Sequence, residues 1–343
     1  AAADARDAGR CAPVLVAQDL TVRFQTADGE VLAADRLSFE IGRGESAGVV
    51  GESGSGKTQT FLALMGLLAR NGRATGSVRF RDEEILNLPP KALNRVRGVR
   101  LSMIFQDPMS ALNPYLRISR QMTEVLTTHK GLGREAARER AIALLDRVGI
   151  PAVRRRFDLY PHEFSGGMRQ RVMIAMALLC EPELLIADEP TTALDVTVQA
   201  QILDLLGELQ RDFGMAIVLI THDLAVVAGL CERVLVMYAG RIVEEAPVDA
   251  LFEAPQHPYS AGLLRSMPRI DEARREELTI IPGQPPDLQA MMPGCAFTDR
   301  CRYAFERCPA DRPALRPAGP GRRKACHLEA LPREPGPAGG RGR

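Results

Sequence analysis

Hydrophobic and polar positions alternate in part along two segments near the start of the chain. These segments are Val14–Phe24 and Val31–Ile41, and a turn-like sequence, Ala27-Asp28-Gly29, separates them. Partial alternation over about ten residues is typical of a strand with one buried and one exposed face. The two segments therefore predict an antiparallel β-hairpin.

After Gly42 the apolar residues come in short unbroken runs instead. Four such runs, separated by long helical stretches, cover residues 46–50, 101–105, 184–187 and 216–220. Strands that are apolar on both faces are typical of a parallel sheet with helices on either side. We expect an α/β core, followed by a second hairpin over Arg233–Glu245 around Ala239-Gly240.

Helical periodicity dominates between Asp107 and Leu179. Within Arg134–Val148, apolar residues recur at the spacing of one helix face, at Ala137, Ala141, Leu144, Leu145 and Val148. This spacing is that of an amphipathic helix. The region predicts a helical insertion into the α/β core.

Length and charge narrow the class of protein. With 343 residues, the chain exceeds the ~250–300 at which single cores stop growing, so we expect a large domain with an appendage. Lys plus Arg number 44 and Asp plus Glu 43, so there is no basic excess of the kind that binds nucleic acid.

No segment is long and apolar enough to span a bilayer. The longest apolar run, Val172–Cys180, is about half of the ~18 residues that a spanning helix needs. The first ten residues also lack the apolar centre of a secretory signal. We expect the chain itself to stay in the cytosol.

A glycine-rich loop follows the first buried run. The sequence Gly51-Glu52-Ser53-Gly54-Ser55-Gly56-Lys57-Thr58 matches the G-x-x-x-x-G-K-[ST] pattern and precedes an amphipathic helix over Thr60–Leu68. In such a loop, backbone N–H groups surround phosphate oxygens, and the helix N-terminus adds positive potential. We expect Lys57 to reach the β and γ phosphates and Thr58 to hold Mg²⁺. A glycine-rich turn without function is the alternative, and the strand-loop-helix context disfavours it.

Two carboxylates end the buried run at 184–187. Asp188 and Glu189 follow a strand too apolar to lie on the surface. Asp188 suits a water-mediated hold on Mg²⁺, and Glu189 could orient the water that attacks the γ phosphate. A solvated strand end is the alternative, and the phosphate loop upstream disfavours it.

The next motif separates this chain from kinases, GTPases and helicases that share a phosphate loop. Ser165-Gly166-Gly167-Met168-Arg169-Gln170 resembles the signature of ATP-binding cassette (ABC) proteins. In physical terms, the motif predicts a helix over Met168–Leu179 that Ser165 caps. The N-terminus of this helix would be a second anion site. A plain helix cap is the alternative.

Other segments resemble ABC elements and occur in the order found in that family. Gln106 resembles the Q-loop, Ala193-Leu194-Asp195 the D-loop and His222 the H-switch, while Phe24 occupies the place of an aromatic residue that stacks on adenine. Alone, Gln106 would be a surface amide, His222 a structural histidine and Phe24 a core residue.

The resemblance to ABC proteins implies a role for each of these residues. MgATP would be bound through Lys57, Thr58, Gln106 and Asp188, with Gln106 also counted among the catalytic residues. Glu189 and His222 would carry out hydrolysis. The signature of one subunit closes over the phosphate loop of another in this family, and the helical insertion docks on a membrane permease.

The end of the chain resembles the C-terminal extension of ATPases from oligopeptide and dipeptide importers. The similar segments are Gln256–Leu264 and Ile281–Pro286. The resemblance implies import of peptides, with a homologous second ATPase subunit, two integral membrane permease subunits and an extracytoplasmic peptide-binding protein as partners, at the cytoplasmic face of the bacterial inner membrane. Nickel or other small-solute importers, a non-transport ABC ATPase acting on nucleic acid and a non-catalytic subunit are the alternatives.

Four of the seven cysteines crowd the last fifth of the chain, at Cys295, Cys301, Cys308 and Cys326. In a reducing cytosol, such a group favours metal binding over disulfides. The spacing matches neither common zinc sites nor the usual ferredoxin run. The resemblance implies a 4Fe–4S cluster with all four thiolates as ligands; zinc and unliganded thiols are the alternatives.

Together these patterns predict an α/β fold, a P-loop ABC ATPase with a RecA-like parallel-sheet core. An antiparallel β subdomain, a helical subdomain and a small Cys-containing C-terminal extension complete it. The expected organisation is a disordered N-terminus (1–12), a nucleotide-binding domain (13–254, helical subdomain about 107–179), the extension (255–330) and a disordered tail (331–343).

Overall fold

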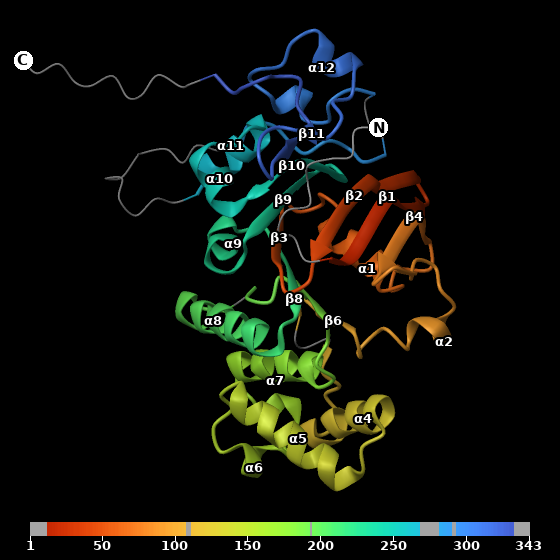
Figure 1. The fold of residues 1–343 in the computed structure, drawn as a ribbon, viewed down its shortest axis with the longest axis vertical. Helices are drawn as coiled ribbons and strands as arrows, with labels where there is room; N and C mark the ends of the chain where they lie inside the picture. The colour runs from red at the N-terminus through yellow and green to blue at the C-terminus, as the bar shows by residue number, and fades with distance from the viewer. Residues whose placement is uncertain (1–11, 108–110, 193, 268–280, 290–292, 333–343) are drawn as a thin grey trace, which may run out of the picture.

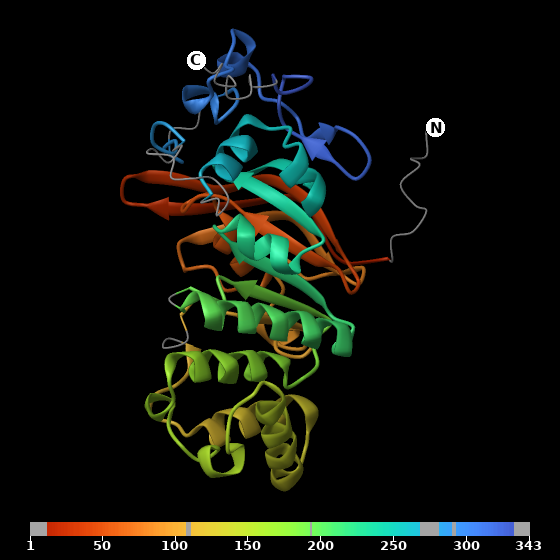
Figure 2. The ribbon, with the colours of Figure 1, turned by 90° about the vertical axis from the view of Figure 1, so that its left-hand side faces the viewer.

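The computed structural model describes residues 12–107, 111–192, 194–267, 281–289 and 293–332. These residues form an elongated molecule with a helical group at one end, β-structure in the middle and the C-terminal extension at the other end (Figures 1 and 2). The predictions of disorder at 1–12 and 331–343 fall almost entirely outside the described residues. The domain boundaries stay a prediction.

The N-terminal hairpin belongs to an antiparallel sheet with strand order β2-β1-β4-β5. The predicted hairpin is confirmed, because β1 (Pro13–Thr26) pairs antiparallel with β2 (Gly29–Gly42). The pattern did not predict β4 (Gly72–Phe80), in which Ala74, Val78 and Phe80 are the buried apolar residues. The short β5 (Glu83–Glu84) completes the sheet.

The larger sheet has the strand order β11-β12-β10-β9-β3-β8-β7-β6 and contains the predicted parallel core. All residues of the four strands predicted from apolar runs are buried, which explains those unbroken runs. The four predicted parallel strands are β3 (Ser46–Val50), β6 (Leu101–Ile104), β7 (Leu184–Asp188) and β8 (Ala216–Thr221). A fifth strand, β9 (Arg233–Tyr238), also pairs parallel with β3. The second predicted hairpin is also present, as β9 (Arg233–Tyr238) and β10 (Arg241–Pro247). The loops after the parallel strands consequently meet at one edge of the sheet.

Helices cover this core and build the helical group. Those of the group are α4 (Ile118–Lys130), α5 (Arg134–Arg147), α6 (Val153–Arg156) and α7 (Gly166–Leu178), with the 3-10 turn η1 (Pro161–Glu163). The periodic residues of the predicted 134–148 helix are all buried, which confirms that prediction. Nearer the sheet lie α1 (Lys57–Leu64), α2 (Pro90–Leu93), α8 (Val196–Phe213) and α9 (Leu224–Leu230). Among the helices in the described part of the chain, none has the length and apolarity that a membrane span requires.

The C-terminal extension packs on the larger sheet and adds strands to it. The helix α10 (Val248–Glu253) leads into the extension. The elements of the extension are α11 (Pro258–Arg265), η2 (Thr298–Arg300), α12 (Arg307–Ala310), β11 (Arg316–Pro317) and β12 (Arg323–Lys324). Strand β12 pairs with β10, and Arg323 forms an ion pair with Glu245. Farther along the interface, Arg312 contacts Asp35 at 2.9 Å. Arginines of the extension thus bind it to both sheets of the cassette.

Candidate functional site

The glycine-rich loop connects β3 to α1, as the motif predicts. Gly56 has φ 93°, and a Cβ there would lie 1.9 Å from the Ala33 carbonyl oxygen. At Gly51, a Cβ would lie 2.2 Å from the Met237 carbonyl oxygen. Only glycine allows the loop to run this close to neighbouring backbone. Helix α1 begins at Lys57, three residues before the predicted Thr60.

Lys57 is folded into the loop. Its side chain is buried, and its Nζ donates to the carbonyl oxygens of Gly51 at 2.7 Å and Glu52 at 3.0 Å. Burial lowers the pKa of Lys57, against the opposing charges of Glu189 and Asp188. The loop therefore holds a desolvated ammonium ion beside the first turn of a helix, an arrangement that attracts a phosphate.

Asp188 and Thr58 meet beside this lysine. Asp188 ends β7 with an exposed fraction of 2%, and Thr58 Oγ1 donates to its Oδ1 at 3.1 Å. Burial raises the pKa of Asp188 to about 6, despite the Thr58 hydrogen bond and the Lys57 charge. A carboxylate and a hydroxyl side by side are hard oxygen ligands of the type that Mg²⁺ prefers.

Glu189 is held by three side chains from different segments. Gln106 Nε2 donates to Oε2 at 2.8 Å, Thr192 Oγ1 donates to the same oxygen at 2.9 Å, and His222 Nδ1 lies 3.0 Å from Oε1. Burial raises the pKa of Glu189, but the hydrogen bonds from His222 and Thr192 outweigh it and leave the pKa below its ordinary value. The residue also has φ 46°, an uncommon conformation for a non-glycine residue. An ionised carboxylate is thus held in one orientation at the sheet edge.

The signature and D-loop residues make their hydrogen bonds at helix starts. Ser165 Oγ accepts from Met168 N at 3.3 Å and caps α7, which confirms the predicted cap. Asp195 Oδ1 accepts from Val198 N at 2.9 Å and caps α8. Gly167 lies against Val198, while Gly166 has open space where a Cβ would be. Of the D-loop, Ala193 lies outside the described residues.

The remaining nucleotide candidate, Phe24, is half-buried at the end of β1. A Cβ on Gly72 would lie 2.6 Å from the Phe24 ring, so the ring rests on the backbone of β4. Its stacking on adenine stays a prediction, and so do the roles of Ser53 and Gly54, which lie exposed at the tip of the loop.

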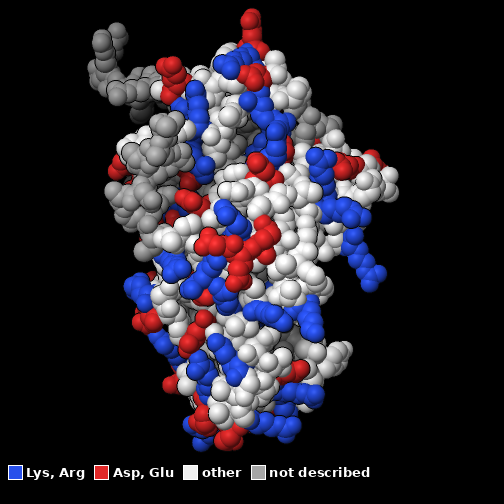
Figure 3. Space-filling view, turned by 45° about the vertical axis from the view of Figure 1, so that its right-hand side comes forward, with Lys and Arg blue, Asp and Glu red and all other residues white. Residues whose placement is uncertain are grey.

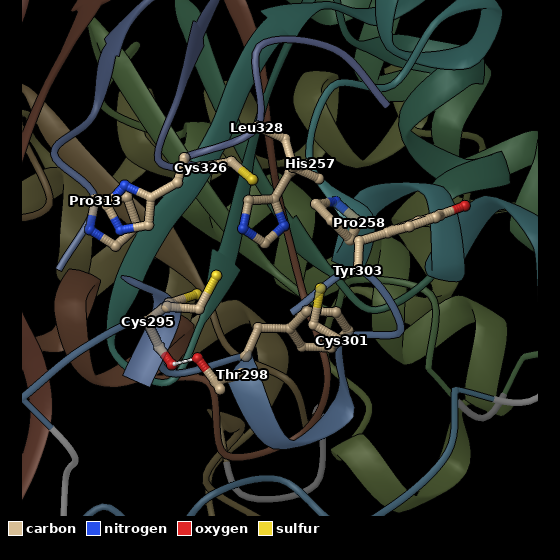
Figure 4. Close-up of a pocket in the computed structure, with 12 residues that line it drawn as sticks. His257, Pro258, Cys295, Thr298, Cys301, Tyr303, Pro313, Cys326 and Leu328 are labelled. Carbon is tan, nitrogen blue, oxygen red and sulfur yellow. Dashed lines mark hydrogen bonds between the residues drawn. The ribbon is translucent and has the colours of Figure 1, made fainter. Parts of the chain in front are cut away.

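The four late cysteines line one pocket of the extension, together with His257 and Phe297. Figure 4 shows the sulfur atoms of Cys295, Cys301 and Cys326 facing the same space beside the His257 ring. Burial, with a smaller contribution from the neighbouring thiols, raises the pKa of Cys301 to about 11. Within the described ranges, no three His, Cys, Asp or Glu side chains are arranged to hold a single metal ion. The structure therefore brings the four thiols to one pocket, but it does not support the 4Fe–4S cluster that the resemblance implies.

Comparison with known proteins identifies the family. Residues 34–192 match the model of the ABC transporter family, and residues 243–308 match that of the oligopeptide/dipeptide transporter C-terminal region. The oligopeptide transport ATP-binding protein OppD of Salmonella typhimurium is 57% identical over 91% of this chain and 93% of its own length. The chain belongs to the OppD family of ABC transporter ATPases. OppD of Bacillus subtilis is 50% identical over 87% of this chain and 84% of its own length.

Solved structures agree with this family and with the predicted fold. A dimeric ATP-binding cassette in a post-hydrolysis state with ADP and Pi has a TM-score of 0.62 and 26% identity, covering 68% of this chain and 98% of that chain. A Clostridium perfringens cassette from the cbiONQ complex has a TM-score of 0.60 and 29% identity, covering 70% and 91%. The α/β ABC ATPase fold is confirmed, and with it ATP hydrolysis as the chemistry of this class.

Sequence reasoning missed several residues that complete the OppD-like site. Thr192 holds Glu189, and buried Gln170 donates to the Pro190 carbonyl oxygen, which ties the signature helix to the acidic strand end. Both stand in or next to motifs that the sequence singled out. A third contact, between Glu52 of the loop and Arg300 of the extension, joins residues 248 positions apart and has no local signal.

Proposed function

We propose that the chain binds MgATP at loop 51–58 and hydrolyses it to drive peptide import. The observation that carries this proposal is the convergence of the Lys57, Asp188 and Glu189 side chains at one edge of the sheet. Lys57 would contact the phosphates, while Thr58 and Asp188 would hold Mg²⁺. Glu189, oriented by Gln106 and His222, would direct the attacking water.

We also propose that the chain is one half of a two-site motor. The signature residues Ser165, Gly166 and Gly167 and the D-loop residue Asp195 lie at the starts of α7 and α8, and Val196 beside them is 85% exposed. Helix N-termini of this kind attract anions. A homologous second ATPase subunit would offer its nucleotide to this face and receive the one bound here.

The relatives suggest the cargo and the remaining partners. OppD relatives are named for oligopeptide transport, and we propose oligopeptides or dipeptides as cargo, carried through two integral membrane permease subunits from an extracytoplasmic peptide-binding protein. The chain would then lie at the cytoplasmic face of the inner membrane. Figure 3 shows acidic and basic side chains interspersed on the face in view, which favours protein partners over nucleic acid. A nickel or other small-solute importer would use the same motor.

Isolation of the intact complex tests this proposal. Affinity purification of the full chain from detergent-solubilised membranes should recover a second ATPase and two permease subunits, whose identity also indicates the cargo.

A substitution in the helical insertion tests the contact with the permease. Tyr115, at 86% exposure in this insertion, is suited to contact the permease. We expect Tyr115→Ser to lose the permease subunits and to keep the second ATPase. Phe305→Ser, an exposed aromatic in the extension, is the matched control. Recovery of the chain alone, or with nucleic acid, would contradict the assignment.

For the cysteine pocket, we propose a 4Fe–4S cluster. The support for it is that four thiols line one pocket, since cysteine thiolates are the usual ligands of such clusters. Cys295, Cys301, Cys308 and Cys326 would be the ligands. When bound, such a cluster would cross-link the extension and could accept one electron.

Metal analysis of anaerobically purified protein tests the cluster. We expect brown absorbance and about four iron atoms per chain. Cys301→Ser should lose most of both, while Cys231→Ser, which removes a buried thiol outside the pocket, should keep them. Stoichiometric zinc without iron, or neither absorbance nor metal, would refute the cluster.

A further inference from the structure

Glu52, the second residue of the phosphate loop, is held by the C-terminal extension. Its N–H donates to Tyr259 Oη at 2.8 Å. Its carboxylate accepts two hydrogen bonds from Arg300, at 2.7 Å to Oε2 and 3.0 Å to Oε1. Its carbonyl oxygen accepts from Lys57 Nζ at 3.0 Å. The extension therefore grips the same residue that Lys57 contacts.

Arg300 and Tyr259, the two side chains that hold Glu52, are themselves held by their surroundings. Arg300 has a side-chain exposure of 5%, and its Nε donates to the Pro282 carbonyl oxygen at 2.9 Å. Tyr259 is fully buried, and its ring centroid lies 4.6 Å from that of Tyr238 and 5.4 Å from that of Phe297. A bidentate arginine and a packed tyrosine lose little freedom when they hold Glu52, so they can set its position.

The charges at this contact bear on the binding of an anion. Glu52 lies close enough to Lys57 for its charge to act on the pKa of that lysine, as those of Glu189 and Asp188 do. An unpaired carboxylate at position 52 would repel a triphosphate and compete for the ammonium ion of Lys57. Arg300 balances the charge of that carboxylate through its two hydrogen bonds to the carboxylate oxygens.

We infer that Arg300 and Tyr259 are positioning residues for nucleotide binding, through which the extension holds the phosphate loop in its anion-binding shape. The inference rests on the proposed role of residues 51–58. It gives the extension a direct part in the ATPase cycle, because Arg300 ends the η2 turn that lies between Cys295 and Cys301 of the cysteine pocket. Any change that moves η2 would then be transmitted to the loop.

Nucleotide affinity of the full chain tests the inference. We expect Arg300→Gln to weaken binding of a non-hydrolysable MgATP analogue about tenfold, equivalent to about 1.4 kcal/mol, as measured by calorimetry. Tyr259→Phe should weaken it less, because it removes one hydrogen bond and keeps the ring. The double variant Arg300→Gln/Glu52→Gln should recover most of the affinity, since it removes the unpaired carboxylate together with its partner.

Two further variants separate this inference from simple loosening and from failure of the loop assignment. Arg312→Gln breaks another ion pair of the extension, with Asp35, and should leave affinity unchanged even where the melting temperature falls. Lys57→Met should abolish binding if residues 51–58 are the phosphate loop. Unchanged affinity in Arg300→Gln while Lys57→Met loses binding, equal weakening in Arg312→Gln, or no recovery in the double variant would overturn the positioning role. Retained binding in Lys57→Met would instead remove the loop assignment on which it rests.

Discussion

Glu189→Gln should lower ATP turnover at least about a hundredfold and leave MgATP binding within about threefold of the parental affinity. The glutamine side chain has the same length, so its amide can still contact Gln106 and Thr192, which hold the carboxylate at 2.8 and 2.9 Å. It lacks the negative charge that would draw a proton from the attacking water. Phosphate release and analogue affinity, measured on the same preparation, separate chemistry from binding.

The control for this substitution is another Glu→Gln exchange on the surface. Glu139→Gln removes an exposed carboxylate of α5 that pairs with Arg154, far along the chain from the motifs. It should hydrolyse ATP at the parental rate. If Glu189→Gln also did so, the catalytic role of Glu189 would be wrong, and its contact with His222 would then serve only to hold the strand end.

Local patterns were sufficient to predict the core and the phosphate loop. Strand β7 is apolar at each of its first four positions because its two faces pack into two different core clusters, Leu184 and Ile186 into one and Leu185 and Ala187 into the other. Position 56 requires glycine because its φ is positive and because a Cβ there would clash with the Ala33 carbonyl oxygen. Requirements of this kind act on a few consecutive residues, so they produce a short sequence motif that can be recognised. The sequence therefore predicted the strand ends from which Asp188, Gln106 and His222 extend.

Contacts between distant segments could not be predicted in this way. No motif marks His257 in the sequence, yet it is 1% exposed, and burial lowers its pKa to about 3. Its Nδ1 accepts from Tyr259 N at 3.1 Å, so it starts α11 beside the residue that holds Glu52. Strand β12 lies in a run rich in Pro, Gly and Arg, which does not predict a strand. It forms because it pairs with β10, a segment distant in the sequence. Neither feature has a periodicity of its own.

The substitution Asp188→Asn should have opposite effects on function and stability. It should abolish MgATP hydrolysis, because a neutral amide is a poor partner for Mg²⁺. In the absence of nucleotide and metal, it should stabilise the fold above pH 6. The folded-state pKa of Asp188 is about 6 against an ordinary value of 3.8, so ionisation of this buried group opposes folding.

The sign of the pH dependence follows from that shift. A carboxyl whose pKa is raised on folding contributes its stability below pH 3.8 and loses it as pH rises through about 6. The parental chain should therefore lose about 3 kcal/mol between those limits from this group, and the D188N chain should not. Because the asparagine side chain can still accept from Thr58 Oγ1, the local hydrogen bond is preserved.

Urea unfolding in a metal chelator, repeated from pH 4 to pH 8, measures this difference. The curves of the parental and D188N chains should converge at the acid end and separate by about 3 kcal/mol at pH 8, in favour of D188N. Asp28→Asn, in the exposed turn between β1 and β2, should produce no such divergence. If D188N were less stable than the parental chain at every pH, the buried carboxylate would be compensated in the folded state. In the structure, the buried Asp188 carboxylate destabilises the fold, and a bound Mg²⁺ would balance its charge. The residue needed for nucleotide chemistry therefore lowers the stability of the chain.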